Sequence, residues 1–171
     1  MFALIKLIQS LFGALHSEGT PGQLAAGIVL GSFLGLTPLF NLHNAVIFAA
    51  LVLLNVSFAG GLLGWALFVP VGFLLDPLFD WIGHSLLLAP SLRGLWTSLY
   101  NTPIIPLTNF NNTVVIGSLV FALLFSVPLF FAIRWAVVRY RATVGERVRQ
   151  SRWYRAVTAS KLYNAYRMFR P

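Results

Sequence analysis

Two aspartates and one histidine are spaced so that their side chains could hold a metal ion or share a proton. Asp76, Asp80 and His84 stand at positions i, i+4 and i+8, so a helix would stack them on one face. Such a face could bind a divalent metal, or two of its side chains could share a proton so that their protonation is coupled. A second interpretation needs no chemistry, because Asp76 directly before Pro77 is suited to cap a helix N-terminus. We favour capping, with Asp80 paired to Arg93.

A polar turn interrupts an otherwise apolar stretch and holds the next candidate group. Polar atoms between two apolar arms are costly unless paired or wet. If the two arms are re-entrant, these polar groups lie together inside the membrane. If the arms cross the membrane, the turn is a loop in the headgroup layer. His43 could titrate or bind a metal, although a histidine satisfied by backbone carbonyls is the commoner case. The turn residues are Thr37, Pro38, Asn41, His43 and Asn44.

The sequence carries no familiar catalytic or cofactor-binding motif. It has no cysteine, no His-Glu-x-x-His zinc motif, no Gly-x-Ser-x-Gly nucleophile motif and no phosphate-binding or dinucleotide-binding glycine loop. We therefore expect no enzyme activity, no catalytic residue, no cofactor and no bound metal. The competing hypothesis is an intramembrane enzyme or ion-coupled carrier that uses His43, Asp76, Asp80 and His84.

Composition and charge indicate a membrane protein. Of the 171 residues, 58% are hydrophobic and 9% are charged, whereas ordinary soluble domains carry about a quarter charged residues. The charges are also segregated. Residues 1–131 hold two basic and three acidic residues, whereas residues 133–171 hold ten basic residues and one acidic residue. This split excludes an evenly solvated surface and predicts an apolar body with a basic cytoplasmic tail.

The hydrophobic runs predict an all-α, polytopic integral membrane protein with three to four hydrophobic helices and amphipathic terminal helices. Its elements are an interfacial helix at 1–17, a broken or re-entrant hairpin and a following helix at 23–75, a short helix at 77–89 and a transmembrane helix at 113–138. Together they form a membrane domain, residues 1–138, followed by a basic amphipathic tail, residues 139–171. An even number of passes would place both termini in the cytoplasm.

Glycines mark where helices should pack closely. Gly27, Gly31 and Gly35 share one helix face, and such a ridge of small residues lets two membrane helices approach each other. We expect this ridge to pack against the helix that follows Pro38. The glycines expected at helix contacts are Gly27, Gly31, Gly35, Gly60, Gly61 and Gly64.

Basic residues at and after the end of the last apolar helix predict contact with lipid headgroups. Each cation near an anionic surface contributes about 1 kcal/mol. Because the tail continues directly from a membrane helix, we expect it to bind anionic phospholipid and not nucleic acid. A protein partner or a second copy in the membrane is expected as well. The headgroup-contacting residues are Arg134, Arg139, Arg141, Arg147, Arg149, Arg152, Arg155 and Lys161.

Taken together, these motifs resemble a family of small bacterial inner-membrane proteins built on a domain of unknown function. The resemblance rests on Gly27-x3-Gly31-x3-Gly35-x2-Pro38, Asn41-Leu42-His43-Asn44, Asn55, and the segments LLDPLFDWIG and LWTSLYNTPIIPLTNFNNTVVIGSL. It implies a protein of the cytoplasmic membrane that acts beside a larger envelope protein of the lipid-bridge type. We expect a non-enzymatic subunit or scaffold in envelope lipid handling or transport. A membrane anchor with a lipid-binding regulatory tail is the third hypothesis.

Overall fold

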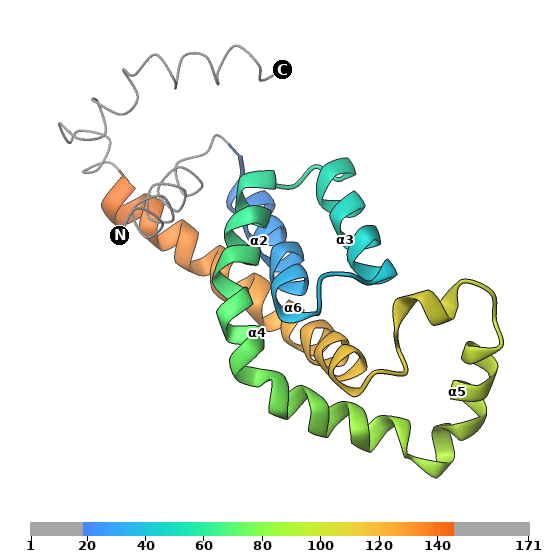
Figure 1. Ribbon diagram of the computed structural model, residues 1–171. Coiled ribbons are helices and arrows are strands. Elements are labelled where there is room, and N and C mark those ends of the chain that lie inside the picture. The colour runs from blue at the N-terminus through green and yellow to red at the C-terminus, as the bar shows by residue number, and fades with distance from the viewer. Residues whose placement is uncertain (1–18, 146–171) are drawn as a thin grey trace.

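The computed structural model describes residues 19–145, which are helical and contain no strand. The α-helices are α2 (Pro21–Leu36), α3 (Leu42–Leu53), α4 (Phe58–Leu87), α5 (Arg93–Tyr100) and α6 (Thr113–Tyr140) (Figure 1). Short helical turns, η1 (Pro90–Leu92), η2 (Ile105–Thr108) and η3 (Arg141–Gly145), stand between or after them. The all-α prediction is confirmed for this part of the chain. The interfacial helix expected at 1–17 and most of the tail expected at 139–171 lie outside the described residues.

Local capping explains where the three best-packed helices begin. Thr20 and Gln23 form a capping box at the start of α2, each side chain accepting from the other's backbone N–H. Ser57 caps α4 and Asn112 caps α6, each side-chain oxygen accepting from the N–H three residues further on. These caps satisfy donors that have no partner inside their own helix.

The short helix expected at 77–89 is not a separate element. α4 runs without a break from Phe58 to Leu87, through Pro70 and Pro77. A proline inside a helix removes one hydrogen bond and bends the helix, and α4 is visibly curved (Figure 1). Asp76 therefore lies within α4 and does not cap a new helix, so the capping prediction is wrong.

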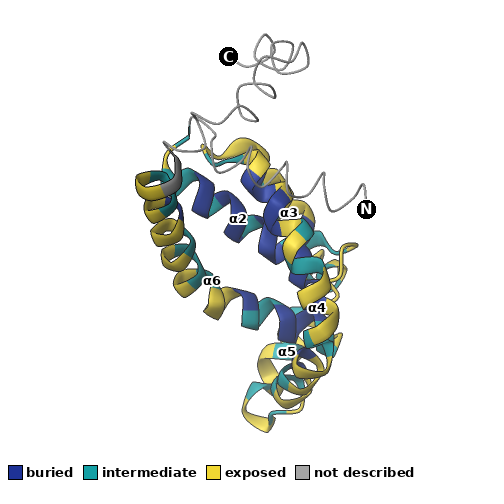
Figure 2. Cartoon of the chain, turned by 90° about the vertical axis from the view of Figure 1, so that its left-hand side faces the viewer, coloured by how far each residue is buried: buried dark blue, intermediate teal, exposed yellow. Residues whose placement is uncertain are grey.

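α2 is the central helix of the fold. It packs along α4 and α6, and α3 runs back beside it after the turn at residues 37–41 (Figure 1). Leu24 and Ile28 of α2 meet Leu63 of α4 and Val137 of α6 in one buried cluster. A second cluster consists of Val29, Phe33, Leu36, Phe79 and Ala122. Figure 2 shows these buried stretches on the facing sides of the helices.

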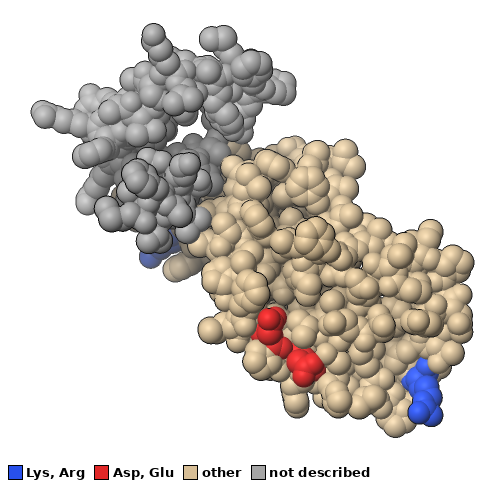
Figure 3. All heavy atoms as spheres, viewed as in Figure 1, with Lys and Arg blue, Asp and Glu red and all other residues tan. Residues whose placement is uncertain are grey.

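The outward faces of the helices are also apolar. Phe73, Leu74 and Leu124 are 75%, 81% and 75% exposed, and the face in Figure 3 carries few charged side chains among its described residues. Two helices, Phe58–Leu87 and Thr113–Thr143, are long and apolar enough to cross a membrane, and 28% of the most apolar stretch of each is buried. α2 and α3, of 16 and 12 residues, extend only about 24 Å and about 18 Å, short of a hydrocarbon core of about 30 Å.

Candidate functional site

Glycines bring α2 into close backbone contact with α4. A Cβ added at Gly31 would overlap the carbonyl oxygen of Gly61, and one added at Gly64 would overlap the carbonyl oxygen of Ile28. Only bare backbone allows the two helices to approach this closely. The expectation that the ridge packs against the helix after Pro38 is wrong. That helix is α3, whereas the ridge packs against α4. The six expected glycines, Gly27, Gly31, Gly35, Gly60, Gly61 and Gly64, all lie where added atoms would clash with neighbouring elements.

Two glycines that the sequence reasoning missed join α4 to α6. A Cβ at Gly83 would overlap the carbonyl oxygen of Thr113, and one at Gly117 would overlap that of Phe79. Neither glycine has another glycine four residues away, which is the signal that identified the other set. Their role becomes visible only when the two helices are placed side by side.

The polar turn between α2 and α3 satisfies its own hydrogen bonds. The Thr37 hydroxyl lies 2.7 Å from the carbonyl oxygen of Phe33 and 2.8 Å from Oδ1 of Asn44, and donates to one of them at a time. The Asn44 amide donates to the carbonyl oxygens of Pro38 at 2.7 Å and Leu39 at 3.3 Å. Thr37 and Asn44 are each 4% exposed. The buried part of this turn therefore needs no water to pair its polar atoms.

The segment after α5 reaches the same turn. Asn109 donates from its side-chain amide to Oδ1 of Asn41 at 2.6 Å, and Asn41 in turn donates to the carbonyl oxygen of Pro38 at 2.7 Å. Asn109 has φ 54°, in the left-handed region that asparagine tolerates. The sequence gives no signal for this pairing, because the two asparagines are far apart in the chain. The contact places η2 beside the start of α3.

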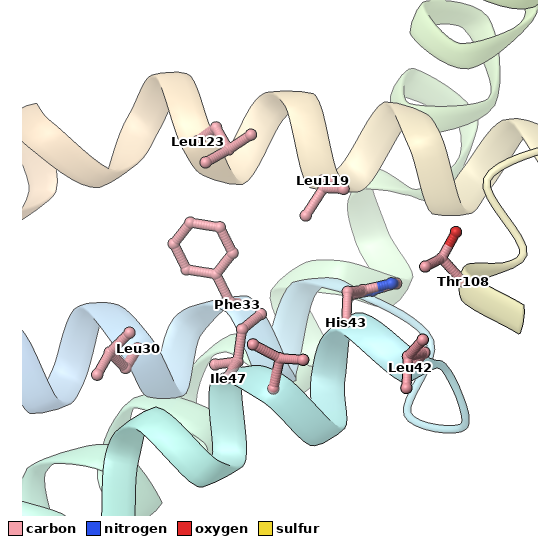
Figure 4. A pocket seen from close by; sticks show the side chains of 9 residues that line it. Leu30, Phe33, Leu42, His43, Ile47, Thr108, Leu119 and Leu123 are labelled. Carbon is pink, nitrogen blue, oxygen red and sulfur yellow. The ribbon is translucent and has the colours of Figure 1, made fainter. Parts of the chain in front are cut away.

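His43 is unlike its polar neighbours in the turn. Both imidazole nitrogens are shielded from solvent, and neither has a hydrogen-bonding partner among the described residues. The backbone of Thr108 faces the ring but does not meet it in good hydrogen-bonding geometry. The ring stands at one end of a cleft of about 450 Å³ between α2, α3 and α6 (Figure 4). The cleft is lined by Leu30, Phe33, Leu42, His43, Val46, Ile47, Thr108, Leu119 and Leu123.

The expected acid and histidine face on α4 does not form a metal site in the structure. Oδ1 of Asp80 accepts a hydrogen bond from the Thr113 hydroxyl of α6, and no ion pair joins Asp80 to Arg93 in the described part of the chain. The expected pairing of Asp80 with Arg93 is therefore wrong. Between residues 19 and 145, no group of three or more His, Asp or Glu residues could hold a metal ion. Asp76, Asp80 and His84 thus share a helix without forming a common site.

The basic residues at the end of α6 lie beside the start of α2. The Arg141 guanidinium donates to the carbonyl oxygen of Gly19 at 2.9 Å, which ties together the two ends of the described chain. Arg134 and Arg139 lie on the last turns of α6. At the opposite end of the molecule, the Trp96 indole donates to the carbonyl oxygen of Leu86 at 3.0 Å. The expected headgroup-contacting residues Arg147, Arg149, Arg152, Arg155 and Lys161 lie outside the described part.

Fold and site together define an all-helical protein with two apolar helices long enough to cross a membrane, joined by glycine contacts and bordered by an apolar cleft. The chain belongs to the family described as "Uncharacterized protein conserved in bacteria (DUF2062)", whose model matches residues 7–144. This confirms the predicted membership of a bacterial family built on a domain of unknown function. An "Uncharacterized protein" of Treponema pallidum (strain Nichols) is 32% identical over 138 residues, covering 81% of this chain and 85% of that protein. No solved structure matches the chain.

Proposed function

We propose that the protein is an integral protein of the bacterial cytoplasmic membrane that serves as a non-enzymatic subunit in envelope lipid handling or transport. The supporting observation is the apolar surface of α4 and α6. A core helix of a soluble protein is mostly buried, but only 28% of the most apolar stretch of each of these helices is buried. Apolar surface of this extent needs cover by lipid or by another protein.

The ends of the described chain support a topology with both termini in the cytoplasm. α4 and α6 are consecutive long helices, so two passes would return the chain to the side on which it started. The hydrogen bond from Arg141 to Gly19 fits this arrangement, because it joins the end of the second pass to the start of α2. Arg134, Arg139 and Arg141 gather at that end, and basic residues favour the cytoplasmic side.

The hairpin of α2 and α3 fits a re-entrant element in this topology. α2 starts beside the start of α4, where the Ser57 N–H donates to the Gln23 carbonyl oxygen at 3.0 Å. It ends near Gly72, where an added Cβ would lie 2.7 Å from the Gly35 carbonyl oxygen. Asp76 and Asp80, the first charged residues towards the opposite end, lie about 6 Å and about 12 Å further along α4. The turn would thus lie at depth, where irregular backbone must be covered by protein, and its internal hydrogen bonds meet that need.

A binding role is better supported than a catalytic one. His43 lies on α3 in the cleft, whereas Asp80 pairs with Thr113 at the contact of α4 with α6. The groups that an enzyme or ion carrier would combine are therefore distributed over different surfaces. The cleft itself is apolar, and its rim residues Val46 and Leu123 are 63% and 56% exposed, so a lipid chain could enter from the side. The basic tail would add contact with anionic phospholipid.

Membrane fractionation followed by alkaline extraction tests the placement, and purification in mild detergent tests the subunit role. We expect the protein to stay with the membrane at high pH and to retain phospholipid together with a larger protein or a second copy. Recovery in the alkaline supernatant would contradict the membrane placement. A clean monomer without lipid or partner at every detergent level would contradict the subunit role.

Topology can be tested by single cysteines, since the chain contains none. Ser17→Cys and Ser160→Cys should react with a membrane-impermeant reagent only when it reaches the cytoplasmic side. Thr97→Cys on α5 should react from the opposite side. Labelling of Ser17→Cys and Ser160→Cys from different sides would refute the even number of passes.

A further inference from the structure

We propose that the cleft lined by His43, named here the His43 cleft, binds one acyl chain of a neutral glycerolipid that carries a free hydroxyl group. The proposal rests on the proposed membrane location, because the cleft would then open towards lipid. It goes further by naming the class of lipid and the side chain that recognises it.

The shape of the His43 cleft fits an extended chain with one polar end. The cleft runs from Leu30 and Leu123 at its apolar end to His43 and Thr108 at the other (Figure 4). Phe33, which is 8% exposed, lies between these two ends (Figure 4). Its volume of about 450 Å³ lies within the range of roughly 300–1,000 Å³ that is typical of sites for small organic ligands. A straight apolar chain could fill this space while its polar group stays beside the imidazole.

The polar end of the cleft offers two complementary hydrogen-bonding positions. A neutral imidazole has one N–H donor and one acceptor nitrogen, and in His43 both are shielded from water and unpaired within the described chain. An ester carbonyl can accept from the N–H, and a hydroxyl can donate to the other nitrogen. A monoacylglycerol or diacylglycerol carries both groups next to its acyl chain. Binding would therefore pair atoms that the protein itself leaves unpaired.

The absence of charge in the lining argues for a neutral headgroup. None of the residues that line the His43 cleft is Lys, Arg, Asp or Glu. A phosphate placed beside His43 would be removed from water without a cation to pair with it, which is strongly unfavourable. Leu119 lies about 9 Å along α6 from Thr113, the first residue of that helix. The apolar part of the cleft thus lies below the start of α6, where an acyl chain would lie at the proposed membrane location.

Photolabelling of the full-length protein in mild detergent tests the proposal. The probe is a monooleoylglycerol analogue with a diazirine in its acyl chain, and the comparison is a phosphatidate analogue with the same chain. We expect the neutral probe to label peptides of α2, α3 and α6, and unlabelled monooleoylglycerol to compete. His43→Phe keeps a ring but removes both nitrogens, and should weaken apparent binding about tenfold. Leu123→Trp, which fills the cleft, should also weaken it.

His84→Phe is the matched control, because His84 lies on α4 and outside the cleft lining. It should bind the neutral probe as the unsubstituted protein does. Each variant is first checked for its melting temperature, and His43→Leu replaces His43→Phe if the larger ring prevents folding. Unchanged binding by the His43 variant would overturn the role of the imidazole. Equal labelling by phosphatidate would overturn the choice of a neutral lipid.

Labelling outside α2, α3 and α6, or no labelling, would overturn the site itself. None of these results bears on the membrane location, which the alkaline extraction decides separately. A protein that remains in the membrane but fails to bind acylglycerol would therefore retain the proposed placement and lose this ligand.

Discussion

Replacing Gly31 by alanine should force apart α2 and α4, whose backbones are in close contact at this residue. The added Cβ would overlap the Gly61 carbonyl oxygen and lie 2.8 Å from the Trp65 backbone nitrogen. Both are backbone atoms of one helix, so no side chain can rotate away to make room. The methyl group can be accommodated only if α2 or α4 shifts.

The size of the effect follows from two opposing terms. Overpacking of a close contact destabilises by about 1–3 kcal/mol, whereas alanine is favoured over glycine inside a helix by about 0.5–1 kcal/mol. Gly31→Ala should therefore lower the free energy of unfolding by about 0.5–2 kcal/mol. The larger side chain of Gly31→Leu should lower it further. Gly22→Ala on the same helix is the control, because its Cβ would meet only Thr20 Oγ1 at 3.9 Å, so that only the favourable term remains.

Thermal unfolding of the purified protein in detergent gives the order of stability. We expect Gly31→Leu to melt lowest, Gly31→Ala next, and Gly22→Ala at or above the unsubstituted protein. Leu30→Ala should be mild, because Leu30 lines an open cleft and trimming it leaves no closed cavity. Equal melting temperatures for Gly31→Leu and Leu30→Ala would refute the reasoning, since the ridge would then face lipid and not α4.

Further predictions concern the turn, the cleft and the second glycine contact. Asn44→Leu should destabilise the protein by about 1–3 kcal/mol in the same thermal assay, because it removes the hydrogen bonds of the buried Asn44 side chain with Thr37, Pro38 and Leu39. His43→Leu should raise the stability of the ligand-free protein by about 1–3 kcal/mol in chemical denaturation, since it removes two buried unpaired nitrogens. Gly117→Ala should lower the melting temperature as Gly31→Ala does, because its Cβ would overlap the Phe79 carbonyl oxygen. A rise in stability with Asn44→Leu, a loss with His43→Leu or no change with Gly117→Ala would contradict the respective argument.

Features set by residues close in the chain were predictable. The apolar run at 113–138 anticipated α6, because both its capping residue Asn112 and its long apolar stretch are local properties. The glycine ridge was visible for the same reason, since its four-residue spacing places it on one face of any helix. Its partner was not predictable. Spacing shows that a ridge can accept a close neighbour, but several glycine-bearing helices could have supplied that neighbour.

The helix break expected at Pro77 shows a different limit of prediction from the sequence. A proline preceded by an acidic residue usually marks a helix start, but α4 continues through it. Packing against α6 holds the helix together on both sides of this point, since Leu63 meets Val137 before it, and Phe79 is fully buried and Gly83 lies directly against Thr113 after it. Tertiary contacts therefore override the local preference. The cleft was unpredictable for a related reason, because it depends on three helices and η2 meeting across long stretches of chain.

Two neighbouring polar residues of the hairpin, Asn44 and His43, differ in whether the protein pairs their polar atoms, and this difference indicates a structural role for Asn44 and a functional role for His43. Asn44 and His43 are adjacent on α3, and successive residues on a helix point about 100° apart, so Asn44 faces the turn while His43 lines the cleft. Asn44 pairs with three groups of the turn, whereas His43 leaves both nitrogens unpaired in the described chain. An apolar residue at position 43 would serve folding better, because it would remove two buried polar atoms without breaking a hydrogen bond. His43 destabilises the protein when the cleft is empty, but its two nitrogens match a polar ligand. Binding of such a ligand in the cleft therefore explains the histidine best.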